Sequence, residues 1–146
     1  MEVFANYLGG AAFEVTARGH RVVSDQPVEH GGADSGMTPP EFLLGALASC
    51  AAYYAAEYLK ARGLPANRLR VRVSAEKALR PARLESFRIE VDAPGLDEKN
   101  RAGVLRAVHS CLVHNTLAGS PRVEVSLVSP PIQSEAEPAV GNAYRI

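Results

Sequence analysis

The sequence has no tryptophan, only two cysteines and only two methionines among its 146 residues. Two cysteines are too few for the disulfide framework of a small secreted domain, and they favour a reducing compartment in which thiols stay free or cycle between redox states. No segment has the charged start and apolar centre of a signal peptide, and no run reaches the roughly 18 apolar residues of a membrane span. These absences predict a cytoplasmic protein that does not enter the membrane.

The chain also lacks an excess of charge of either sign, because 16 Lys and Arg residues balance 16 Asp and Glu residues. Nucleic acids and anionic membrane surfaces are bound by basic surfaces, so the balance argues against both as partners. Chemistry on a small molecule is the class that remains. The length suits one domain, which we take to span residues 1–146.

Short apolar segments open the chain. Residues 3–8 and 11–16 flank a Gly-Gly dipeptide, which readily adopts the positive φ angles of a tight hairpin. Residues 20–24 can add a third strand. The segment 25–36 has no periodicity and is rich in glycine and aspartate, so it predicts a surface loop that leads to a helix.

The central element is a long apolar helix that carries the first cysteine. Thr38 before a proline pair is typical of a helix start, because its hydroxyl can accept from a free amide while proline loses no hydrogen bond there. The helix is expected to extend to about Arg62, before Gly63. One face of it carries large side chains at helical spacing on both sides of Cys50, namely Leu43, Leu47, Tyr54 and Tyr58. Cys50 is therefore expected on a buried or pocket-lining face.

The second half of the chain repeats the pattern of strands followed by a helix. Residues 69–76 and 87–92 alternate apolar and polar side chains, which predicts an antiparallel pair of half-exposed strands. Residues 98–112 have helical periodicity, with Cys111 closing the helix, and residues 123–127 alternate again as a last strand. This order predicts an α+β fold with antiparallel sheets.

Several stretches together resemble one known family. They are Asp25-Gln26-Pro27 with Gly31-Gly32, the helix start Thr38-Pro39-Pro40-Glu41-Phe42-Leu43-Leu44 leading to Cys50, and His109-Ser110-Cys111-Leu112-Val113-His114-Asn115-Thr116-Leu117. The combination, with 61 positions separating the cysteines, is similar to the OsmC/Ohr family of osmotically inducible and organic-hydroperoxide-resistance proteins. The resemblance implies antiparallel sheets packed around a long central helix in an intertwined homodimer.

The resemblance also implies a reaction without a metal or an organic cofactor. Family members reduce organic hydroperoxides with a peroxidatic cysteine, here Cys50, and a resolving cysteine, here Cys111. Electrons come from a dithiol reductant such as a lipoyl group. The chemistry needs both thiols, because thiolate attack on the peroxide leaves a sulfenic acid that the second thiol condenses into a disulfide. Considered without the resemblance, either cysteine would more often be a small core residue.

An apolar site raises the pKa of a thiol, so a nearby cation is expected to restore the thiolate. The family pattern implies an arginine from the amino-terminal strands, held by a glutamate near the helix start. Arg18 and Arg21 are both candidates for the cation, and Glu41 is the candidate carboxylate. Glu41 lies nine positions before Cys50, which places it on the opposite face of a helix and about 13 Å along the axis. An equally good interpretation is that the Glu41 carboxylate complements the positive end of the helix dipole.

Two other functions are compatible with the residues. His109, Cys111 and His114 are of types that bind zinc, although on a continuous helix only the last two share a side. The other function is a small-ligand or lipid-binding module with weak or no peroxidase turnover, which the position of Glu41 keeps open.

Overall fold

The protein is described from a computed structural model, which defines the structure of residues 1–128. Its amino-terminal part is an antiparallel sheet of three strands in the order β1 (Phe4–Gly9), β2 (Ala12–Ala17) and β3 (His20–Ser24). Gly9 and Gly10 form the first turn with φ angles of 114° and 57°, which other residues adopt only with strain. The three strands predicted from the sequence are therefore present, with boundaries that differ by at most one residue.

The predicted long helix is α1 (Pro39–Lys60), and Thr38 precedes it in an extended conformation. The residues that α1 buries recur every fourth position, namely Leu47, Ala51, Ala55 and Leu59. Full burial of one leucine side chain stabilises the fold by about 1.5–3 kcal/mol. The helix also satisfies the length and mean hydropathy of a membrane span, contrary to the expectation from the sequence. One such helix is weak evidence for a membrane span, because the core helix of a soluble protein can meet the same criterion.

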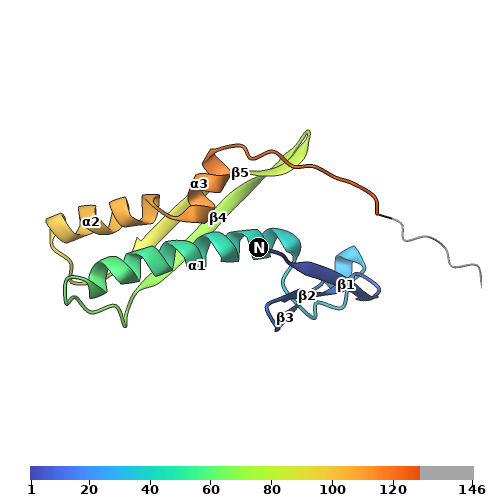
Figure 1. The fold of residues 1–146 in the computed structure, drawn as a ribbon, viewed down its shortest axis with the longest axis horizontal. Coiled ribbons are helices and arrows are strands. Elements are labelled where there is room, and N and C mark those ends of the chain that lie inside the picture. Colours follow the sequence, from blue (N-terminus) through green and yellow to red (C-terminus); the bar gives the residue numbers. More distant parts are fainter. Residues whose placement is uncertain (129–146) are drawn as a thin grey trace, which may run out of the picture.

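A hairpin and two further helices complete the described fold. β4 (Arg70–Leu79) pairs with β5 (Ala82–Asp92), and α2 (Glu98–His109) and α3 (Leu112–Ala118) follow. α1 packs against both α2 and the β4–β5 hairpin, and α3 reaches the middle of α1 (Figure 1). The amino-terminal sheet lies beside the beginning of α1, away from α2. This arrangement is the predicted α+β fold with antiparallel sheets and a long helix.

Small residues allow α1 and α2 to approach closely. Ala51 and Ala55 are fully buried and pack in one cluster with Val104 and Val108 of α2. Near the end of α1, the ring of Tyr58 occupies the space where Gly103 would carry a side chain. A Cβ at this point of α2 would overlap the ring, so the Tyr58 side chain would have to move to admit one.

The segment between β3 and α1 is the mostly exposed loop predicted for residues 25–36, but it has an ordered interior. This segment contains a short 3-10 helix, Val28–His30. Asp25, at the start of the segment, is only 1% exposed. Its carboxylate accepts hydrogen bonds from the backbone N–H groups of Gln26, Ala33 and Ser35 and from the Ser35 hydroxyl, over 2.8–3.1 Å. A buried charge with four donors organises the loop from within.

Two elements near the carboxyl end differ from the prediction. The helix predicted over residues 98–112 ends at His109, and a separate helix begins at Leu112. Residues 123–127 form no strand: they pair with no other strand within residues 1–128, and Val125 and Leu127 are 94% and 93% exposed. Alternation specifies which side chains share a face, but a strand also needs a neighbouring edge to pair with.

The hydrogen bonds to the Asp25 carboxylate predict that the stability of the fold depends on pH. These four hydrogen bonds, those of Ser35 foremost, lower the pKa of Asp25 from 3.8 to about 2. The stabilisation is therefore fully present above pH about 4 and is lost as the pH falls toward 2. We expect the free energy of unfolding of the unmodified protein to decrease over this window, and Asp25→Asn to be less stable at neutral pH with a flatter acid profile. Urea denaturation at a series of pH values measures both, and parallel profiles for the two proteins would contradict the assignment.

Candidate functional site

The break between α2 and α3 positions the second cysteine. The N–H groups of Ser110 and Cys111 close the last turn of α2 on the carbonyls of Ala107 and Val108, each at 3.0 Å. Cys111 then adopts an extended conformation, with φ −61° and ψ 128°, and becomes the residue before α3. Its Sγ accepts the backbone N–H of His114 at 3.4 Å, so the thiol caps the start of the new helix. Cys111 therefore begins a helix as well as following one.

The two thiols meet at this position. Cys50 lies in the middle of α1 and is half-buried, whereas Cys111 is fully buried, and neither forms a disulfide. The Cys111 thiol donates to Cys50, and the backbone N–H groups of Val113 and Leu112 also point to the Cys50 sulfur. The structure thus brings together the two cysteines that the sequence separates by 61 positions.

These contacts shift the pKa of Cys50 downward. Burial by itself disfavours the thiolate and raises the pKa. The three donors, which are the Cys111 thiol and the N–H groups of Val113 and Leu112, outweigh burial and leave the pKa of Cys50 below its ordinary value of 9.0. A thiol with a lowered pKa is more readily ionised to the nucleophilic thiolate.

The pKa of Cys111 moves in the opposite direction. Burial is the largest cause, and its hydrogen bond to Cys50 adds to it, because that bond is made by the protonated thiol. The backbone N–H of His114 lowers the pKa without reversing the shift. Of the two thiols, Cys50 is therefore the one that loses its proton at the lower pH, while Cys111 keeps its proton to higher pH.

The two candidate arginines lie on the amino-terminal sheet. Arg18 occupies the turn between β2 and β3 with φ 51°, and Arg21 pairs with Glu14 on the neighbouring strand at 3.5 Å. Among the described residues, no arginine is one of the groups that shift the pKa of Cys50. Backbone N–H groups of α3 lower the pKa of Cys50, whereas the family pattern implies that a cation does so.

Glu41 lies at the start of α1 and bonds to the residue before the helix. Its Oε2 accepts the Thr38 backbone N–H at 2.7 Å and the Thr38 hydroxyl at 2.8 Å. These two bonds, together with the charge of Lys77, lower the pKa of Glu41. The carboxylate therefore stabilises the first turn of the helix in the geometry of a capping box.

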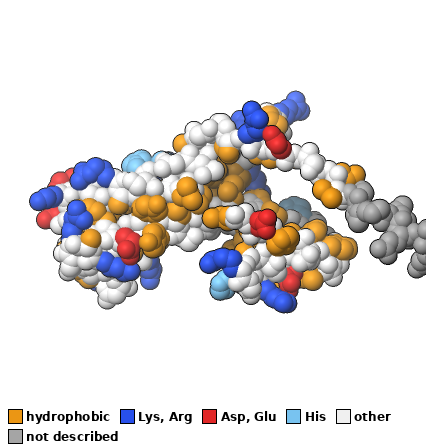
Figure 2. All heavy atoms as spheres, in the orientation of Figure 1, with side chains coloured by type: hydrophobic (Ala, Val, Ile, Leu, Met, Phe, Trp, Pro, Cys, Tyr) orange, Lys and Arg blue, Asp and Glu red, His pale blue; other side chains and the backbone are white. Residues whose placement is uncertain are grey.

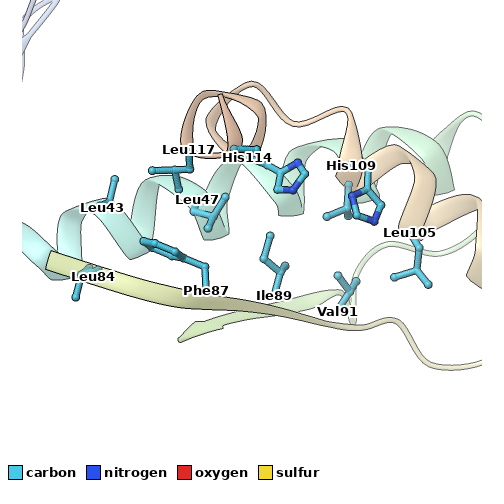
Figure 3. A pocket seen from close by; sticks show the side chains of 12 residues that line it. Leu43, Leu47, Leu84, Phe87, Ile89, Val91, Leu105, His109, His114 and Leu117 are labelled. Atoms are coloured by element: carbon cyan, nitrogen blue, oxygen red, sulfur yellow. The ribbon is translucent and has the colours of Figure 1, made fainter. Parts of the chain in front are cut away.

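An apolar pocket of about 610 Å³ lies next to the thiol pair. Its walls come from α1, β5, α2 and α3, and the side chains of Phe87 and Ile89 face Leu47 and His114 across it (Figure 3). Neither cysteine lines this pocket, but Leu47 is one helical turn before Cys50 and His114 is one turn after Cys111, so residues close to both thiols form part of its wall. The volume and the mostly apolar lining are typical of a small-molecule site.

His109 and His114 line the pocket as a pair, which the sequence did not predict. Their ring centroids are 5.2 Å apart in an edge-to-face arrangement. On a continuous helix through both residues, His109 and His114 would not have faced each other, and the break at Ser110 and Cys111 is what brings them together. Within residues 1–128, no three His, Cys, Asp or Glu side chains converge as a metal site would require.

Comparison with known proteins places the chain in a family. The family of OsmC-like proteins matches residues 31–126, which is more than half of the chain. The chain belongs to the OsmC-like family. No curated protein matches this OsmC-like chain.

Solved structures share the fold at low identity. An OsmC-like protein from Mycoplasma pneumoniae matches with a TM-score of 0.68 and 21% identity, over 81% of this chain and 86% of its own. The organic hydroperoxide resistance protein OhrB of Bacillus subtilis matches with a TM-score of 0.56 and 17% identity, over 81% and 90%. A Psychrobacter arcticus protein described in terms of osmotic stress and detoxification gives 0.71 and 19%, over 78% and 85%. At these identities the comparison supports the fold.

The opposite pKa shifts predict which thiol reacts first. We expect iodoacetamide to alkylate Cys50 before Cys111, with a midpoint below pH 9.0. Cys111→Ala removes a donor and should move the midpoint of Cys50 upward, whereas Cys111→Ser keeps a hydroxyl donor and should move it less. Mass spectrometry of peptides alkylated at a series of pH values measures both sites. Faster labelling of Cys111, or equal midpoints in all three proteins, would contradict the opposite pKa shifts.

Proposed function

We propose that this OsmC-like chain is a thiol-dependent peroxidase that reduces organic hydroperoxides, with Cys50 as the peroxidatic and Cys111 as the resolving cysteine. The observation that carries the proposal is the direct contact of two reduced thiols whose pKa values are shifted in opposite directions. Membership of the OsmC-like family and the shared fold with an organic hydroperoxide resistance protein support a role in peroxide stress.

The reaction follows from the arrangement of the two sulfurs. The Cys50 thiolate attacks the terminal oxygen of the hydroperoxide, the O–O bond breaks, and the organic part leaves as an alkoxide that takes up a proton to become an alcohol. Cys50 is then a sulfenic acid, and the Cys111 thiol next to it condenses with it to give a disulfide and water. A dithiol reductant, of the lipoyl type in this proposal, reduces the disulfide by exchange and returns both thiols.

The apolar pocket supports a preference for organic substrates. An alkyl group that enters it leaves water for a surface of leucine, isoleucine and phenylalanine side chains, which favours binding. Hydrogen peroxide has no such group and gains nothing from these walls. The proposed order of substrates is therefore alkyl hydroperoxides before hydrogen peroxide.

The decisive experiment measures consumption of an alkyl hydroperoxide with dihydrolipoamide as reductant, beside thioredoxin and glutathione systems. Cys50→Ser should reduce turnover to the rate without protein. Cys111→Ser should stop multiple turnover but leave a sulfenic acid on Cys50 that a dimedone probe captures, because nothing condenses with it. Equal turnover by the unmodified protein and Cys50→Ser would exclude the reaction, and the absence of a Cys50–Cys111 disulfide after peroxide treatment would exclude the resolving role.

We also propose that the protein works as a homodimer. The single chain exposes large apolar side chains on its amino-terminal sheet, including Phe4, Tyr7 and Leu8 at 56–66% (Figure 2). It also exposes the apolar side chains of residues 123–128. A second subunit is the partner that would cover these surfaces and offer an edge for the unpaired segment.

The dimer makes a test with a matched control available. Val125→Asp places a charge on the apolar side of the alternating segment and should shift the protein from twice its chain mass of 15.6 kDa toward the monomer. Ser126→Asp adds the same charge at the neighbouring position of opposite phase and should leave the dimer intact. Sedimentation equilibrium measures both masses. A monomeric unmodified protein would refute the dimer, and equal behaviour of the two variants would refute the role of this segment.

The pocket also favours a second function, which is the binding of a small apolar ligand without turnover. Neither cysteine lines the cavity of about 610 Å³. Under this alternative, Cys50→Ser leaves ligand binding unchanged and hydroperoxide consumption is absent in both proteins.

A further inference from the structure

The pocket beside the thiols has a polar site on an otherwise apolar wall. Ten of its twelve lining residues are apolar, and the other two are His109 and His114. Figure 3 shows the ring of His114 at the centre of the cavity, on the side opposite Ile89 of β5. His109 lies farther along the same side, toward Leu105.

His114 has a hydrogen-bonding atom that nothing in the described chain satisfies. Its Nδ1 is buried, and no group within residues 1–128 is hydrogen-bonded to it. Buried ring nitrogens in proteins nearly always have a partner, because water has been removed and its hydrogen bond must be replaced. The walls around the ring offer leucine, isoleucine and phenylalanine side chains, which cannot replace it. A ligand in the pocket can, once the imidazole turns to bring the buried atom to the cavity surface.

The same residue is tied to the thiol pair through its backbone. The His114 N–H donates to Cys111 Sγ at 3.4 Å, and the Cys111 thiol contacts Cys50. One residue therefore has its main chain on the thiols and its side chain in the pocket. A linear molecule with its tail along Phe87 and Leu43 would have its polar end near His114, the residue whose backbone is bonded to Cys111.

We propose that His114 binds the oxygen-bearing end of an aliphatic hydroperoxide through Nδ1, while the pocket between α1 and β5 holds the alkyl chain. This rests on the proposed function and names the group that orients its substrate. During attack by Cys50, the O–O bond breaks toward the inner oxygen, and His114 hydrogen-bonds that oxygen as negative charge develops on it. The resulting alkoxide takes one proton, delivered through the imidazole and regained from solvent, and leaves as the alcohol.

Binding of the product-like alcohol tests the contact without turnover. In Cys50→Ser protein, 1-octanol should bind about three- to tenfold more weakly when His114 is changed to Leu, which is the range expected for one hydrogen bond. His114→Asn keeps an amide at the position of Nδ1 and should retain most of the affinity. Calorimetry measures the affinities. Equal affinity in the Leu variant and its parent would overturn the proposal.

A second measurement covers the case in which His114→Leu disturbs α3. All variants keep the backbone N–H of residue 114, so an unchanged alkylation midpoint of Cys50 shows that α3 is intact. If the midpoint moves, NMR of the histidine rings in Cys50→Ser protein decides. We expect the His114 ring signals to shift on saturation with 1-octanol and the signals of the exposed His20 to stay unchanged. Immobile His114 signals at saturation would overturn the proposal.

Kinetics separate this proposal from the proposed function. For octyl hydroperoxide, His114→Leu should lower kcat/KM by more than the loss in octanol affinity, since the hydrogen bond strengthens as charge develops. His114→Asn should restore most of the rate. If Cys50→Ser and the unmodified protein consume hydroperoxide equally, the peroxidase function is wrong while the octanol result stands by itself. If Cys50→Ser is inactive but the His114 variants consume hydroperoxide as fast as the unmodified protein, the peroxidase function stands and the role of His114 is wrong.

Discussion

The close approach of α1 and α2 is the constraint on which the rest of the structure depends. Ala51 and Ala55 bury their small side chains against Val104 and Val108, and Gly103 leaves room for the Tyr58 ring. With the two helices held at this distance, the chain that leaves α2 passes directly over Cys50. Larger residues on this face would separate the helices and lift Cys111 and α3 away from the first thiol. The core packing therefore sets the geometry of the redox site.

The site shows how a buried thiol can be ionised by neutral groups. Burial alone would protonate Cys50, and a cation is the usual remedy. In this chain the remedy includes two backbone N–H groups of α3 and the Cys111 thiol. The Cys111 thiol that donates to Cys50 is itself buried. Burial and this hydrogen bond both raise the pKa of Cys111, so it keeps its proton. Arg18 and Arg21 stay predictions for the cation that the family pattern implies, and Glu41 has a role at the helix start that accounts for its position.

The sequence predicted most elements because local rules decide them. Alternation placed β4 and β5, and the Thr38-Pro39-Pro40 start placed α1. The break after α2 was missed because apolar residues continue at helical spacing through Val108, Cys111 and Leu112, with no glycine or proline to mark it. The burial of Asp25 was missed because its donors come from residues up to ten positions later. The segment 123–127 has the pattern of a strand, but pairing depends on an edge that periodicity does not supply.

The same limit applies to the site. Two cysteines could be selected from the sequence by their chemistry and by the family resemblance, but their contact depends on how the helices pack. His114 was selected only as a possible zinc ligand, because its place in the pocket depends on what surrounds Nδ1 and not on its neighbours along the chain. A continuous helix would have directed His109 and His114 to different sides. Their pairing in one cavity is a product of the break at Ser110 and Cys111.

The loop around Asp25 has a consequence for how the sequence can change over evolutionary time. Gly32 packs so tightly on the Gln26 carbonyl, and Gly36 on the Val23 carbonyl, that no side chain fits at either position. Both glycines lie in the stretch that supplies donors to the carboxylate. A side chain at either glycine would displace the backbone on which Ala33 and Ser35 present their N–H groups. A substitution there would therefore reach the Asp25 carboxylate through the main chain, without any change at Asp25 itself.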